Sequence, residues 1–339
     1  AYSEDAIPFY QQVLAIEAEV LGKEHPDYAT SLNSLAALYR SLGDYARAEP
    51  LYMEAAAIRE KIFGKQHPSY AASLNNLALL YMSSGDYARA ESLFAEATAI
   101  EEKVLGKEHP DYATGLNNLA LLYDSMGESA RSEPLYLEAK AIRERVLGKE
   151  HPDYSQSLNN LAALYFSMGD TARAEPLYLE ATAIDEKVLG KNHSDYAIDL
   201  SNLAALYRSI GDNAQAEPLF LEATAIVEKL LGRKHPDYAT SLYNLAGLYM
   251  SMERSDEAIE LCEQGLEITR DHLSRTAYIL SERQQLAMNQ MLRYRLDSYL
   301  ACCLKQEAVP KQAVEQVIMW KGETLVRQRE LRLAADNPA

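Results

Sequence analysis

Hydrophobic residues recur along this chain with the spacing of amphipathic helices, and the whole pattern repeats every 42 residues. In one period, a first apolar stripe with i, i+3, i+4, i+7 spacing consists of Leu74, Leu77, Ala78 and Tyr81. A second stripe consists of Tyr87, Ala90, Phe94, Ala97, Ile100 and Val104. Gly85 and Asp86 separate the two stripes, and Gly106 follows the second, as expected of helix ends. Each period therefore predicts two helices joined as a hairpin, and the chain is predicted to be all-α.

Histidines mark the period, at His25, His67, His109, His151, His193 and His235. A fixed period of this size is typical of units that cannot bury a hydrophobic face alone and must stack on their neighbours. The histidines also suggest a metal site. Loops on successive hairpins are separated by about 8–10 Å per helix layer, however, whereas zinc ligands lie about 2 Å from one ion. A helix-entry role is therefore favoured, and neither a metal nor a cofactor is expected.

The repeated sequence motif resembles the tetratricopeptide repeat. The residues that fall at signature positions of that family are Leu74, Leu77, Ala78, Tyr81, Gly85, Tyr87, Ala90, Phe94 and Ala97. The usual unit has about 34 residues, and this longer form with its Asn-Asn-Leu-Ala word is similar to the repeats of kinesin light chains and their bacterial relatives. The resemblance covers about residues 1–270. It implies a right-handed superhelical α-solenoid that binds proteins or peptides.

Two regions are expected, a repeat array over residues 1–270 and a C-terminal segment over residues 271–339. The array opens inside a second helix, because Ala6 and Tyr10 match Ala48 and Tyr52 one period later, and six hairpins follow. The last hairpin departs from the pattern at Glu253, which replaces a glycine. Such drift is typical of a terminal repeat. Longer helical patterns beyond residue 270 predict a helical cap.

The C-terminal segment also resembles the stretch that joins tetratricopeptide arrays to the CHAT domain, a caspase-like cysteine peptidase module. The words that carry this resemblance are SERQQLA, YLACCL and WKGETLVRQRELRLAADNP. The resemblance implies that the repeats regulate a peptidase that begins after Ala339. Some bacterial proteins of this design are activated by partners, including RNA-guided CRISPR effectors. The chain itself shows no Cys-His pair with suitable spacing, phosphate loop or paired-carboxylate signature, so it is not expected to be an enzyme.

The formal net charge of −17 is concentrated in the repeats, because residues 271–339 carry +2 and the remainder carries −19. Such a surface disfavours direct contact between the repeats and nucleic-acid phosphates. A basic partner and a solvated acidic exterior both remain open as interpretations of the charge. The sequence has no apolar run of membrane length, and Cys262, Cys302 and Cys303 show no metal spacing. A cytoplasmic protein is expected.

The first helices of tetratricopeptide arrays line a concave groove, and the resemblance places two asparagine columns there. The first column is Asn33, Asn75, Asn117 and Asn159, and the second is Asn76, Asn118, Asn160, Asn202 and Asn244. Leu79 and Leu121 follow one turn on, and a further column is Arg40, Met82, Asp124, Phe166, Arg208 and Met250. Because an amide both donates and accepts, this pattern favours an amide ladder that holds the backbone of an extended peptide. In kinesin light chains, matching asparagines similarly hold cargo peptide.

The acidic residues belong mainly to the second helices, which the resemblance places in the outer layer. Examples are Glu96, Glu101, Glu102, Glu138, Glu180 and Asp185. The expected groove is therefore nearly uncharged. A clamp for a C-terminal carboxylate needs Lys or Arg beside the asparagines, and only Arg40 and Arg208 come near, so that function is disfavoured.

Three alternatives stay open at this point. The asparagines could instead satisfy backbone groups of the adjacent repeat, or their identity could be a relic of duplication. The protein could be the partner-recognition part of a TPR-CHAT peptidase, or a kinesin light chain-like cargo adaptor with no associated enzyme. It could be a monomer or a weak end-to-end oligomer, since an uncapped first half-repeat exposes apolar surface.

Overall fold

A computed structural model describes residues 6–276 together with residues 293, 295–297, 299–300, 303 and 318. These residues are almost entirely helical and include no strand, which confirms the all-α prediction. The first helices of the hairpins, here called A helices, are α2 (Pro26–Ser41), α4 (Pro68–Ser83), α6 (Pro110–Ser125), α8 (Pro152–Ser167), α10 (Ser194–Ser209) and α12 (Pro236–Ser251). Most of the predicted C-terminal cap and the CHAT-like words lie outside the described residues.

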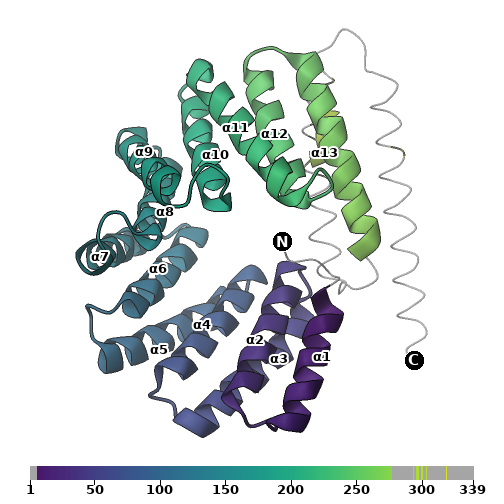
Figure 1. Cartoon of the computed structure of the whole chain (residues 1–339). Helices are drawn as coiled ribbons and strands as arrows, with labels where there is room; N and C mark the ends of the chain where they lie inside the picture. The colour runs from purple at the N-terminus through teal and green to yellow at the C-terminus, as the bar shows by residue number, and fades with distance from the viewer. Residues whose placement is uncertain are drawn as a thin grey trace. The chain divides into compact units, whose positions relative to one another are not determined.

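The second helices, here called B helices, complete the hairpins. They are α1 (Ile7–Val20), α3 (Tyr45–Phe63), α5 (Tyr87–Leu105), α7 (Ser129–Leu147), α9 (Thr171–Val188), α11 (Asn213–Leu231) and α13 (Ser255–Thr276). The chain forms two compact units, residues 1–189 and residues 190–339. Within the first unit each A helix packs most closely on its own B helix, then on the preceding B helix and on neighbouring A helices. In Figure 1, α4 and α6 lie on the inner side of that unit, and α5 and α7 lie on its outer side.

Each A helix begins with the same histidine cap. The Nδ1 atom of His109 accepts a hydrogen bond from the backbone N–H of Asp111 at 3.1 Å, and Pro110 fills the first helical position, where no N–H is needed. The other five histidines make the same bond at 3.1 to 3.2 Å. The predicted helix-entry role of the histidines is therefore confirmed.

Small and large apolar residues alternate across the interface inside each hairpin. In the hairpin of α4 and α5, Ala71 and Ala97 are completely buried beside Tyr70, Leu74 and Ile100. Alanine lets the two helix axes approach closely, and the larger side chains fill the space on either side. The same register recurs one period earlier and later, so these three hairpins share one packing arrangement.

A polar clamp links successive hairpins at the start of four of the B helices. Tyr81 donates its hydroxyl to Glu49 at 2.7 Å, and the guanidinium of Arg89 lies 4.0 Å from the Tyr81 ring centre and 3.4 Å from Glu49. Equivalent sets are Tyr123 with Glu91 and Arg131, Tyr165 with Glu133 and Arg173, and Tyr249 with Glu217 and Arg254. Because these groups are partly exposed, each clamp fixes orientation more than it adds stability.

Glu253 is the only non-glycine residue with positive φ in the described part of the chain, and it replaces a glycine of the repeat. The five equivalent glycines, in the turns between A and B helices, have φ between 75° and 84°, and Glu253 has φ of 61°. A side chain in this region costs about 1 kcal/mol relative to glycine.

We therefore expect Glu253→Gly to stabilise the hairpin of α12 and α13 by about 1 kcal/mol, because glycine has no Cβ to strain the turn. Hydrogen exchange of the amides in these two helices measures the effect. Glu253→Ala is the matched control, since it removes the carboxylate but keeps the Cβ. Equal protection in the two variants would contradict backbone strain as the cause.

Candidate functional site

One face of each A helix is left uncovered by the packing. In α4 the side chains that are exposed or half-buried on this side are Ala72, Asn76, Leu79, Met82 and Ser83, with the equivalent positions open in α2, α6 and α8. We call this surface of the first unit the A-helix face. Two of the helices that carry it, α4 and α6, lie on the inner side of that unit in Figure 1. A ligand that approaches the A helices meets only these positions.

The two asparagine columns predicted for the groove have different surroundings. Asn33, Asn75 and Asn117 of the first column are only 8%, 9% and 6% exposed, and Asn159 is half-buried with its own interaction partner. In the second column, by contrast, Asn76, Asn118 and Asn160 are half-buried on the A-helix face. Burial thus removes Asn33, Asn75 and Asn117 as ligand contacts, and the candidate site narrows to the second column.

The asparagines of the second column differ in their hydrogen bonds. The Asn160 amide donates to Asn117 Oδ1 at 2.9 Å, so one asparagine pair links adjacent repeats. The side chains of Asn76 and Asn118 make no hydrogen bond with any described residue. In the second unit, Asn202 has an interaction partner and Asn244 is half-buried. The free amides on the A-helix face are therefore those of Asn76 and Asn118.

The column with mixed side chains also lies on this face. Arg40, Met82, Asp124 and Phe166 are all half-buried, and Leu79 and Leu121 lie one turn away with similar burial. Neither Arg40 nor Asp124 forms a side-chain hydrogen bond or ion pair within the described part of the chain. Partial burial raises the pKa of the Asp124 carboxyl.

Arg208 occupies the position of Arg40 in the second unit but is already engaged. Its Nη1 atom donates to the backbone oxygen of Asn244 at 3.3 Å. A Cβ on Gly247 would lie 2.6 Å from the same nitrogen, so the glycine makes room for the guanidinium. Arg208 therefore connects α10 to α12, and its charge is less available to a ligand than that of Arg40.

Beneath the A-helix face, buried residues of the B helices contact the next A helix. Arg143 donates to Ser157 Oγ at 2.9 Å and to Thr114 Oγ1 at 3.1 Å, and Arg59 makes the equivalent bonds to Ser73 and Thr30. Glu101 occupies the same position in the repeat between Arg59 and Arg143, and Asp185 occupies it in the repeat after Arg143. Both side chains are 4% exposed. Glu101 and Asp185 do lie on B helices, as expected, but their side chains are buried and not on the outer surface, because this position of the B helix points inward.

Glu101 lacks the full set of partners that its arginine counterparts have. Its Oε1 accepts from the Asn75 amide at 3.1 Å, while its Oε2 and Asn75 Oδ1 are buried without a partner. Gly115 stands where four of the other repeats have serine, and a Cβ there would lie 2.6 Å from Glu101 Oε2. Burial, and to a smaller extent the charge of Asp111, raises the pKa of Glu101 to about 7. Ionised Glu101 therefore lowers the stability of the array.

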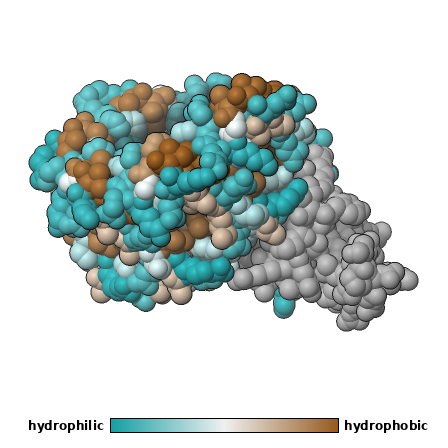
Figure 2. Space-filling view, turned by 90° about the horizontal axis from the view of Figure 1, so that it is seen from below, coloured by the Kyte–Doolittle hydropathy of each residue, from teal (hydrophilic) through white to brown (hydrophobic). Residues whose placement is uncertain are grey.

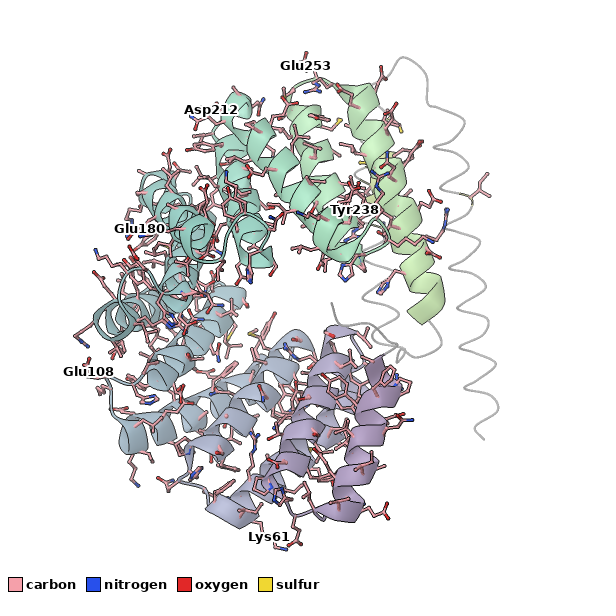
Figure 3. All side chains as sticks on the ribbon, in the orientation of Figure 1. Lys61, Glu108, Glu180, Asp212, Tyr238 and Glu253 are labelled. Carbon is pink, nitrogen blue, oxygen red and sulfur yellow. The ribbon has the colours of Figure 1, made fainter. Side chains whose placement is uncertain are left out.

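The outer surface of the first unit carries several ion pairs within the chain. Loop and B-helix residues form ion pairs between Lys61 and Glu24, and between Arg145 and Glu108. Figure 3 shows Lys61 and Glu108 at the margin of this unit, and Figure 2 shows a face on which hydrophobic residues form only separate patches among hydrophilic ones. A basic partner on this surface would have to compete with these ion pairs.

The described residues contain no group of three or more histidine, cysteine or acidic side chains placed to hold a metal ion. Within the same part of the chain, no helix combines the length and the apolar character needed to cross a membrane. Cys262 and Cys303 are buried, and neither forms a disulfide within the described residues.

This geometry defines an α-helical repeat scaffold. Six overlapping stretches match the tetratricopeptide repeat family, at residues 3–61, 33–103, 69–144, 125–187, 157–229 and 195–271. The chain therefore belongs to the tetratricopeptide repeat family, whose fold is a non-catalytic scaffold.

Two solved structures are similar to this chain. The crystal structure of BtubC (BKLC) from P. vanneervenii matches with 28% identity and a TM-score of 0.55, over 68% of this chain and 92% of that one. The crystal structure of a single-residue variant of nearly identical TPR-like repeats, named for a kinesin light chain of Podosopora anserina, matches with 31% identity and a TM-score of 0.50, over 60% of this chain and 97% of that one. No curated protein matches.

The buried carboxyl of Glu101 should make the stability of the fold depend on pH. Its pKa of about 7 lies above the usual 4.5, so the protonated form stabilises the fold fully below about pH 4.5, and this contribution is lost as the pH rises through about 7. We expect Glu101→Gln, which keeps the acceptor for Asn75, to be more stable than wild type at pH 8 by up to about 3 kcal/mol and nearly equal to it at pH 4.5.

Urea denaturation at the two pH values measures this difference. A second variant, Glu101→Arg with Gly115→Ser, rebuilds the arrangement of Arg143 with Ser157 and should also be more stable at pH 8. If the free energy of unfolding depends on pH in the same way in wild type and in Glu101→Gln, Glu101 is not the group that titrates.

Proposed function

We propose that this protein is a binding scaffold that holds an extended peptide segment of a partner protein on the A-helix face. The observation that carries the proposal is the pair of free, half-buried amides of Asn76 and Asn118 on consecutive A helices. Each amide offers a donor and an acceptor, which is the complement of a peptide backbone. Leu79 and Leu121 lie beside them and offer apolar contacts to ligand side chains.

The wider setting of the scaffold has two candidates. The name of one similar structure, a kinesin light chain of Podosopora anserina, supports a kinesin light chain-like adaptor. The words of residues 271–339 support the partner-recognition part of a cytoplasmic bacterial TPR-CHAT peptidase, activated by a CRISPR-type effector. The reading frame beyond Ala339 separates them. A caspase-like α/β pattern with a histidine and a cysteine favours the peptidase, and a stop codon or a coiled coil favours the adaptor.

The peptide-binding proposal predicts the effect of removing the two free amides. Asn76→Ala with Asn118→Ala should weaken binding of peptides selected from a random 16-residue library by about tenfold or more, because two hydrogen bonds are lost. Fluorescence anisotropy measures the affinity, and thermal unfolding should be unchanged. The matched control is Glu96→Ala with Glu138→Ala on the exposed side of the B helices. Equal affinity of the asparagine variant and wild type would rule out the amide ladder.

We also propose that the scaffold self-associates weakly through α1. Phe9, Val13 and Ile16 are 68%, 42% and 61% exposed on one side of this helix. One period later, Ala55 and Ile58 are 0% and 9% exposed, because an A helix of the same hairpin covers them. The first B helix thus presents an apolar stripe of the kind that later repeats bury.

Sedimentation velocity should therefore show a reversible dimer that forms as the protein concentration rises into the micromolar range. Val13→Glu with Ile16→Glu should shift the protein to monomer, since a buried carboxylate opposes contact between two apolar stripes. Both side chains are exposed in the chain, so the fold should tolerate the change. A wild-type protein that remains monomeric at all concentrations would refute the association.

A further inference from the structure

One position on the A-helix face is basic, apolar, acidic and aromatic in successive repeats, while its immediate neighbours in the sequence stay constant. Every A helix ends with the word Leu-Tyr-x-Ser, and in the first unit the variable residue is Arg40, Met82, Asp124 and Phe166 in turn. The serine that follows is exposed in each of these helices and yet never changes. Exposure alone therefore does not explain the variation, and we call these four residues the variable column.

The two charges in the variable column, Arg40 and Asp124, have no hydrogen-bond or ion-pair partner within the part of the chain that the structure describes. This is unusual here, because Arg89, for example, contacts both Glu49 and Asp86. Asp124 is also next to the C-terminal residue of α6, where the helix dipole is negative and disfavours a carboxylate. Its carboxyl is partly desolvated as well. Asp124 thus lowers the stability of the free protein, and a cation placed beside it would relieve that cost.

The spacing of the variable column can be compared with that of an extended peptide. A helices of successive repeats are in direct contact, as α2 with α4, α4 with α6, and α6 with α8. Packed helices lie about 8–10 Å apart, and an extended chain rises about 3.3 Å per residue, so one repeat corresponds to about three ligand residues. Arg40 and Asp124, two repeats apart, would therefore face ligand residues separated by about six positions.

We propose that the variable column selects an extended peptide with a defined charge pattern, an inference that rests on the peptide-binding function proposed above. The ligand carries an acidic residue opposite Arg40 and a basic residue about six positions away, opposite Asp124. Apolar residues of the ligand lie opposite Met82 and Phe166. The asparagines hold the ligand backbone without regard to sequence, and the variable column supplies the specificity and the register.

The test uses three labelled peptides of equal length in a serine and threonine background. The matched peptide has aspartate, leucine, lysine and leucine at every third position. In the charge-swapped peptide the aspartate and lysine are exchanged, and in the neutral peptide they are asparagine and glutamine. Each is made in both chain directions, because the column does not fix which end of the ligand lies at α2. Binding to the full chain is measured by fluorescence anisotropy at low salt.

Wild type should bind the matched peptide about tenfold more tightly than the charge-swapped one, as expected for two partly desolvated ion pairs. The double variant Arg40→Glu with Asp124→Lys keeps the net charge and should reverse this preference. Glu108→Arg with Arg145→Glu swaps an ion pair on the outer margin, also at constant net charge, and should leave the preference unchanged. Circular dichroism confirms that each variant is folded.

The possible outcomes separate the two proposals. Equal affinity for all three peptides, with loss of binding in the Asn76→Ala, Asn118→Ala variant, would overturn the charge pattern and leave the peptide-binding function standing. Absence of binding by every peptide would overturn both. A preference that does not reverse in the Arg40→Glu, Asp124→Lys variant would assign the selectivity to other residues and overturn the role of the variable column.

Discussion

The enclosure of each A helix by its neighbours is the constraint on which the rest of the structure depends. Helix α4 contacts α3 and α5 on its flanks and α2 and α6 along the row of A helices. Ala71 and Ala78 are completely buried where α4 meets its neighbours. Larger side chains at these two positions would push the helices apart. Only a narrow face stays open, so whatever an A helix offers to a partner must come from a few positions per repeat.

The buried polar groups show that nearly identical repeats are not equivalent in energy. A buried residue of a B helix contacts the residue fourteen positions later, on the next A helix. The two side chains must fit together in size and hydrogen bonding, because neither is open to solvent. Arginine is matched by serine, as in Arg143 with Ser157, and Glu101 is matched by the absence of a side chain at Gly115. The first arrangement satisfies the hydrogen bonds, whereas the second leaves oxygen atoms unpaired. Stability is therefore distributed unevenly along the array.

The same framework separates the residues that build the scaffold from those that distinguish one repeat from another. The histidine caps, the alanine and leucine interfaces and the tyrosine clamps recur with little change, so they fix the geometry of the face. Asn76 and Asn118 recur on that face with free amides, and Arg40 and Asp124 add charges of opposite sign. A repeated scaffold with one variable column can hold many peptides by a common backbone interaction and still discriminate between them.

The sequence by itself determined the helices, because their ends depend on local chemistry. His109 caps α6 through its own neighbour Asp111, Gly106 allows the turn that ends α5, and the apolar spacing defines which stripe each helix buries. The family and the order of hairpins also follow from the periodic pattern. Glu101 was missed because a glutamate on an amphipathic helix usually faces water. Its register with Arg59 and Arg143, and Gly115 in place of serine, was the signal that pointed to burial.

Only the tertiary structure decided between Asn75 and Asn76. Adjacent residues point about 100° apart around a helix, and both asparagines flank the same apolar stripe, so the hydrophobic pattern alone allows either to face a ligand. Packing against α5 encloses Asn75 and joins it to Glu101, while Asn76 stays open. The difference arises from the contact of α4 with α5, and this contact exists only once the two helices of the hairpin have packed together.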